Sequence, residues 1–229
     1  MKGKILIVMV VAIALLCAGV ALAGISATKH NLSSTGPGTV KASAGQQNDE
    51  ICVYCHTPHF ANTGFTGAPL WNKATPAGSY TMYGTTIAGT TPDATPNGIT
   101  KACLSCHDGV SAINSIVNEA GSGKSGPANV AFGTTAAGTA FTMPAGATNL
   151  GTSLADDHPV SITYTAGKAS LNPTTTTLTG WTGASTIADL LRNGKVECSS
   201  CHDPHTSATS LFLRVSNSGS ALCLGCHGK

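Results

Sequence analysis

The apolar residues of this chain are unevenly distributed, and only the first residues form a long apolar run. Lys2 and Lys4 precede an apolar stretch from Ile5 to about Val20, which ends in the tripeptide at 21–23, Ala-Leu-Ala. A basic start, an apolar centre and an A-x-A end are typical of a secretory signal peptide. We therefore expect cleavage after residue 23, which leaves 24–229 as the mature chain of an exported protein. We predict a location outside the cell or at its surface, or otherwise in the periplasm.

Two other interpretations of this segment stay open. In the first, the protein is a lipoprotein and Cys17 is its modified residue, although Leu16 before it is bulkier than such a site prefers. The stretch from Ile5 to Ala23 is also just long enough to remain as a membrane anchor.

Beyond residue 23 the apolar pattern predicts only short elements. Alternation of apolar and polar residues predicts a strand within 159–165 and a second strand over 211–215. The alternating apolar residues are Val160, Ile162 and Tyr164 in the first stretch and Leu211, Leu213 and Val215 in the second.

One short helix is predicted between these strands. Thr186 is followed three residues later by Asp189, the pattern of a helix N-terminus, and Gly194 is a stop signal. The apolar stripe of this helix consists of Ile187, Leu190 and Leu191.

Composition indicates that the polypeptide has little material for a core. Charged residues make up 10% and aromatic residues 5% of the chain, while Gly occurs 27 times. Such a chain has difficulty in offsetting its conformational entropy by apolar burial. Ten of the twelve basic residues lie in 24–229 and balance ten acidic ones, so the composition excludes a basic nucleic-acid-binding surface.

The cysteines explain how a core could still form. The sequence Cys-x-x-Cys-His occurs four times, as Cys52, Cys55 and His56; Cys103, Cys106 and His107; Cys198, Cys201 and His202; and Cys223, Cys226 and His227. This is the attachment motif of c-type haem, in which the two thiols form thioethers and the histidine binds the iron. We predict four covalently attached haem c groups. The fold class is then a multihaem cytochrome c: one domain over 24–229, mostly coil, with short helices at the motifs, a few short strands and a core formed by the four haems.

Other cysteine chemistry fits this pattern less well. A zinc site or a redox dithiol does not require a histidine directly after each second cysteine. All cysteines after residue 23 lie in the four motifs, so none is left for an ordinary disulfide framework.

The number of histidines predicts the coordination of the irons. Eight histidines are present, of which four belong to the motifs; the others are His30, His59, His158 and His205. Four haems with one free axial position each need four more ligands, so we predict bis-histidine ligation throughout. Met82 and Met143 are the competing soft ligands.

The positions of the spare histidines suggest separate roles. His59 and His205 each follow a motif histidine by three residues. Side chains three apart on a helical turn point the same way, so we expect each to reach a neighbouring haem. Asp156 and Asp157 precede His158, and either carboxylate could orient its ring. His30 lies on an N-terminal arm, 24–51, and could reach outside its own subunit.

Saturated irons favour electron transfer over catalysis, because enzymes that convert small molecules on haem need an open position. We therefore predict that the protein is not an enzyme. A multihaem reductase of nitrogen or sulfur oxyanions stays as a less favoured alternative.

The motifs resemble a known family, the OmcE-like tetrahaem cytochromes that polymerise into extracellular filaments. The stretches that carry the resemblance are Glu50–His59, Ala68–Asn72, Cys103–Gly109, Asp157–Ser161, Glu197–His205 and Ala221–His227. The resemblance implies four bis-histidine haems in a continuous stack. It also implies head-to-tail contacts between copies, with one axial histidine donated across the interface; His30 is our first candidate. Redox partner cytochromes or extracellular acceptors would be further partners. The alternative is a soluble periplasmic tetrahaem shuttle.

Overall fold

A computed structural model of the chain describes residues 24–44, 49–76, 78–87, 89–119, 128–168 and 170–228. The predicted signal peptide, including Cys17, lies outside these residues. Most of the described chain is coil, as the sequence predicted, and regular elements are short. Across the described ranges, no helix has the length and apolar character needed to cross a membrane.

Short helices lie at all four motifs, which confirms that part of the prediction. The helices are η1 (Cys52–Tyr54), α2 (Gly98–His107), α3 (Ile187–Leu190), α4 (Cys198–Cys201), η2 (Ser210–Phe212), η3 (Ser218–Ser220) and α5 (Ala221–Cys226). Motif residues lie in η1, α2, α4 and α5. Helices α4 and α5 end directly before the motif histidine, since His202 and His227 have extended backbone angles.

The strands pair locally in two antiparallel ribbons. Strand β1 (Ser115–Ile116) pairs with β2 (Ala128–Asn129), and β3 (Ile162–Thr163) pairs with β4 (Lys195–Val196). The strand predicted over 159–165 is therefore shorter than expected. Ser161 has φ +55°, outside the β region, so the extended run cannot begin before Ile162.

The strand predicted over 211–215 is wrong. Helix η2 occupies its first part, and both Leu211 and Phe212 have positive φ, +58° and +59°. Leu211 is 76% exposed, so the alternation does not mark a buried face. Leu213 forms a single bridge to His202. The backbone curls here because its carbonyl groups bind the third motif, as described below.

The predicted helix at 186–191 is confirmed as α3. The Asp189 carboxylate accepts hydrogen bonds from the backbone N–H of Thr186 (2.8 Å) and from its hydroxyl group (3.0 Å). Ile187 and Leu190 are buried against the core. The helix ends at Leu190, one residue before the end of the predicted stripe, because Leu191 is extended.

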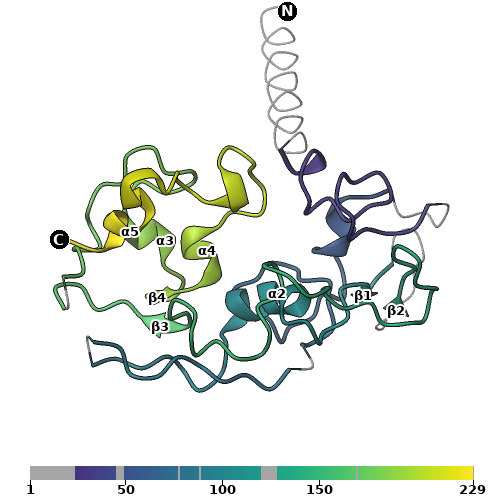
Figure 1. Ribbon diagram of the computed structural model, residues 1–229, viewed down its shortest axis with the longest axis horizontal. Helices are drawn as coiled ribbons and strands as arrows, with labels where there is room; N and C mark the ends of the chain where they lie inside the picture. Colours follow the sequence, from purple (N-terminus) through teal and green to yellow (C-terminus); the bar gives the residue numbers. More distant parts are fainter. Residues whose placement is uncertain are drawn as a thin grey trace, which may run out of the picture.

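Helices α2 and α4 pack against each other near the middle of the molecule (Figure 1), and the described chain has two small apolar clusters. The first contains Leu32, Ala42, Tyr54, Ile113, Ile116, Val130 and Phe132; the second contains Tyr164, Leu178, Ile187 and Leu190. The polypeptide thus has apolar packing of its own, which the low aromatic content did not indicate. A core completed by four haems stays a prediction.

Candidate haem-binding sites

Backbone carbonyl groups orient the histidines of three motifs. Nδ1 of His56 lies 2.7 Å from the carbonyl oxygen of residue 69. Nδ1 of His107 lies 2.8 Å from that of residue 148, and Nδ1 of His202 lies 2.9 Å from that of residue 211. A carbonyl oxygen only accepts, so Nδ1 must carry the proton. Nε2 is then left with a free lone pair, the form in which a neutral imidazole binds a metal.

A repeated backbone arrangement, here called the histidine latch, holds the first, third and fourth motifs. The residue after the motif histidine donates its N–H to the carbonyl oxygen of a residue with positive φ. The pairs are Thr57 with Leu70 (2.9 Å), Asp203 with Phe212 (2.8 Å) and Gly228 with Ser170 (2.6 Å). The acceptors have φ of +52°, +59° and +62°. A non-glycine residue in this region is strained, so the latch is maintained against a local backbone preference.

A second bond closes each latch. The carbonyl oxygen of the second motif cysteine accepts an N–H from Asn72 (2.8 Å), Arg214 (2.9 Å) or Asn172 (2.8 Å), in the order of the motifs. At the second motif the acceptor is one residue later, because Leu150 donates its N–H to the carbonyl oxygen of His107 (2.8 Å) and not to that of Cys106. Three sites are thus built alike and one differently.

Three spare histidines face three motif histidines. The ring centres are 6.1 Å apart for His205 and His56, 6.1 Å for His30 and His107, and 6.4 Å for His158 and His227. Two imidazoles that bind one metal from opposite sides have ring centres roughly 6 Å apart, because each metal–nitrogen bond is about 2 Å long. The planes meet at 17°, 87° and 71°, and rotation about a shared metal–nitrogen axis allows all three angles. The residues present therefore fit a haem iron between each pair.

The environment of His30 suits a ligand. Burial, and next the neighbouring His107, lower the pKa of His30 to about 4, so the ring is neutral at pH 7. Its Nδ1 is buried without a hydrogen-bond partner among the described residues. The ring also packs against Phe212 at 4.2 Å. The arm that carries His30 is thus folded onto its own chain.

The remaining candidates, His59 and His202, are both exposed. In the part of the chain that the structure describes, neither has a histidine ring facing it at the separation found in the other three pairs. His59 follows Pro58 in a bent segment and precedes Phe60, which has φ +54°.

Two of the predicted surroundings of the histidines differ from the observed ones. His202 and His205 do not share a helical turn, since α4 ends before His202, so the helical reason given for their directions is wrong. His205 nevertheless faces the histidine of another motif. The ring of His158 is not oriented by Asp156 or Asp157; its Nδ1 lies 3.1 Å from the carbonyl oxygen of residue 159.

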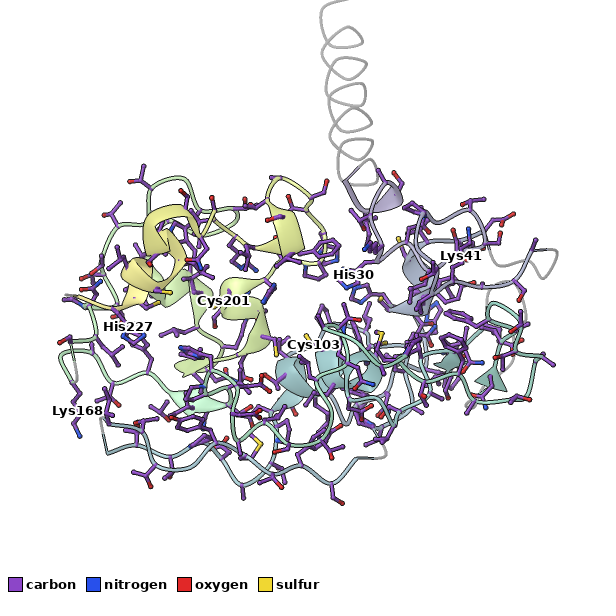
Figure 2. All side chains as sticks on the ribbon, in the orientation of Figure 1. His30, Lys41, Cys103, Lys168, Cys201 and His227 are labelled. Carbon is purple, nitrogen blue, oxygen red and sulfur yellow. The ribbon has the colours of Figure 1, made fainter. Side chains whose placement is uncertain are left out.

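Cysteines of consecutive motifs lie close to one another, so the four sites follow each other in chain order. The thiols of Cys103 and Cys198 are hydrogen-bonded, which raises the pKa of Cys103 and lowers that of Cys198. Burial raises the pKa of Cys55 to about 12, with a further contribution from Cys106. Burial, and next Cys226, raise the pKa of Cys201 to about 11. Figure 2 shows Cys103 and Cys201 near the middle of the molecule and His227 toward one side.

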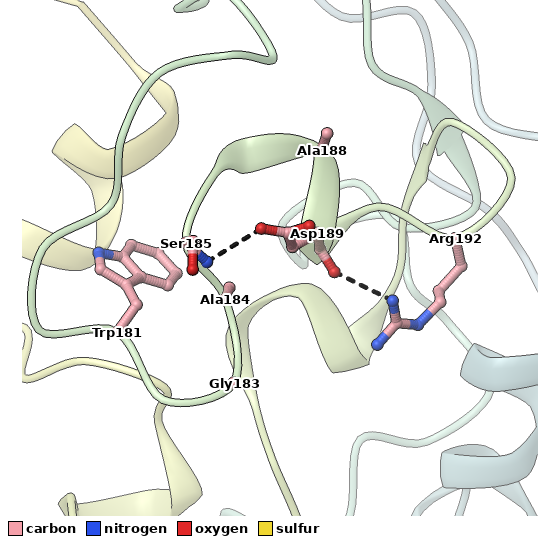
Figure 3. A pocket seen from close by; sticks show the side chains of 7 residues that line it. All are labelled: Trp181, Gly183, Ala184, Ser185, Ala188, Asp189 and Arg192. Atoms are coloured by element: carbon pink, nitrogen blue, oxygen red, sulfur yellow. Dashed lines mark hydrogen bonds between the residues drawn. The ribbon is translucent and has the colours of Figure 1, made fainter.

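Other concave and polar features carry less chemistry. A surface pocket of about 650 Å³ is lined by Trp181, Ser185, Ala188, Asp189 and Arg192 and contains no motif residue (Figure 3). The carboxylate of Asp189 in this pocket already accepts hydrogen bonds from the backbone N–H groups of Ser185 and Thr186. Within the described ranges, no three histidine, cysteine or acidic side chains converge as a protein zinc site requires.

Comparison with known proteins supports the assignment of the third and fourth motifs. Residues 191–229 match the family described as the doubled CXXCH motif, and this region contains the third and fourth motifs. No curated protein matches the chain. The CXXCH motifs indicate covalently bound haem c and electron transfer. Residues 191–229 thus carry the signature of multihaem c-type cytochromes.

Proposed function

We propose that this protein is an exported electron-transfer protein, not an enzyme, that carries four haem c groups with two histidine ligands each. The observation that supports it best is the set of three histidine pairs with ring centres 6.1–6.4 Å apart. When bound, haem iron supplies reversible one-electron chemistry. Three histidine pairs of the chain (His56 with His205, His107 with His30, and His227 with His158) would each hold an iron from two sides, so that no substrate could bind there.

We further propose that copies of the chain join head to tail into an extracellular filament. His30 faces His107 of its own chain, so His59 replaces it as our candidate for the bridging ligand. In this arrangement, His59 of one copy completes the ligation of His202 in the next. Exposed apolar residues near the two histidines support a contact there: Phe60 is 77%, Leu70 54% and Leu211 76% exposed. A heterologous contact of this kind that does not close produces an open helical assembly.

The test uses the secreted protein purified with its haems. We expect an intact mass with four haems, a fully low-spin ferric signal in electron paramagnetic resonance (EPR), and filaments in electron microscopy. A high-spin signal in the resting protein would overturn bis-histidine ligation and support the oxyanion reductase. Monomers alone, with low-spin haems, would overturn the filament and support a periplasmic shuttle.

A further inference from the structure

A buried carboxylate lies at the junction of the second and third motifs. Glu197 directly precedes Cys198 and is 2% exposed. Its carboxylate accepts hydrogen bonds from the hydroxyl of Thr100, from the hydroxyl of Ser161 (3.0 Å) and from the side-chain amide of Asn97 (3.3 Å). The two hydroxyl donors are fully buried, so water does not compete for these bonds.

The hydrogen-bond network presents only donors to this carboxylate. The hydroxyl of Thr100 accepts the backbone N–H of Cys198 (3.3 Å), and the hydroxyl of Ser161 accepts the backbone N–H of Asn97 (2.8 Å). Each hydroxyl has one proton, which it donates to Glu197. With two hydroxyl groups and an amide all donating, Glu197 acts only as an acceptor. Donors directed at a carboxylate favour its charged form.

No basic side chain compensates this charge directly. Among the described residues, none lies within ion-pair distance of Glu197. The nearby Lys195 pairs instead with Asp93, at 2.6 Å. Because the site is buried, the negative charge is screened less than a surface charge would be.

The charge lies close to two haem attachment points. Thr100 is on α2, the helix of the second motif, and its hydroxyl is 3.6 Å from Sγ of Cys198. Cys103 of the second motif lies next to the same Sγ, since Cys198 is the main influence on its pKa. Glu197 is therefore adjacent to one attachment cysteine of the second haem and one of the third.

We propose that Glu197 lowers the reduction potentials of the second and third haems. The inference rests on the proposed function, since it requires both haems to be present. Reduction adds one electron to the iron, and a nearby buried negative charge disfavours that addition. The middle of the haem row is then harder to reduce than it would be without this residue.

Glu197 also has a structural role that the test must separate from its charge. Its backbone N–H donates a hydrogen bond to the hydroxyl oxygen of Ser200 (3.0 Å), a residue of α4. Glu197→Gln removes the charge and keeps the length of the side chain. Glu197→Asp keeps the charge and changes the length. Glu50→Gln is the matched control, because Glu50 precedes the first motif but is exposed.

The experiment is a spectropotentiometric titration of the purified holoproteins. For Glu197→Gln we expect two of the four midpoint potentials to rise and two to stay, whereas Glu197→Asp and Glu50→Gln leave all four close to wild type. Unchanged potentials in a four-haem Glu197→Gln protein, or equal shifts in the Gln and Asp variants, would overturn the proposal. If Glu197→Gln does not fold, Asn97→Lys places a cation beside the carboxylate and should raise the same two potentials; no rise there also overturns it. A wild-type protein with fewer than four haems would instead refute the proposed function.

Discussion

The rings of His56 and His205 lie 6.1 Å apart with an angle of only 17° between their planes, although His56 belongs to the first motif and His205 follows the third. This pairing connects two parts of the chain that are distant in sequence. It makes the first motif depend on the segment after the third, because the histidine that follows the third attachment site faces the histidine of the first.

Loss of His205 should leave one iron without its second ligand. We expect His205→Ala to keep four attached haems and to develop a high-spin ferric EPR signal from one of them. His205→Met should remove that signal, since a thioether can also bind the iron, and should raise one reduction potential. A His205→Ala protein that stays entirely low-spin would contradict the pairing with His56.

Removal of the third motif cysteines tests the number of haems. Each motif attaches one haem through two thioethers, so the double substitution Cys198→Ala with Cys201→Ala should lower the intact mass by one haem. The corresponding double substitution at Cys52 and Cys55 is the matched control and should give the same loss. Equal masses for wild type and either variant would show that the altered motif is not an attachment site.

His59 should be required for assembly. We expect His59→Ala to keep four haems and yet to form no filaments, because His202 of the next copy lacks its ligand. Mixing this variant with a His202→Ala protein should give dimers by light scattering, since only one productive junction can form. If the mixture stays monomeric while the variants retain their fold, His59 does not act between copies.

The histidine latch predicts an unusual effect of glycine. Leu70 has φ +52° and is 54% exposed, so Leu70→Gly removes backbone strain while losing little apolar contact. We expect it to raise the free energy of unfolding by about 1 kcal/mol. The matched control is Leu150, which is 41% exposed and does not have a positive φ. Its N–H donates to the carbonyl oxygen of His107 in the second motif. Leu150→Gly should lower stability by roughly 0.5–1 kcal/mol. Guanidinium unfolding measures both, and destabilisation by Leu70→Gly would contradict the argument.

The fourth motif contains a close approach that a methyl group would disturb. A Cβ at Gly225 would lie 2.3 Å from Cζ2 of Trp181. We expect Gly225→Ala to cost about 1–3 kcal/mol, the range for overpacking. Adding Trp181→Leu should recover part of that loss in thermal unfolding. No recovery would indicate that the backbone, and not the indole ring, limits the site.

Sequence alone determined the attachment chemistry, because each CXXCH motif places its two thiols and its imidazole within five consecutive residues. It also determined local features such as the Thr186–Asp189 cap of α3, where both partners lie within one turn. The scarcity of regular structure followed from composition in the same way.

The tertiary structure decided everything that depends on residues far apart in the chain. Alternation over 211–215 predicted a strand, but the carbonyl groups of Leu211 and Phe212 turn back to hold the third motif, and that requirement overrides the local pattern. No local rule could have paired His205 with His56 or placed Glu197 beside Thr100. The sequence gives the number of histidines. Which histidine faces which depends on the path of the backbone between them.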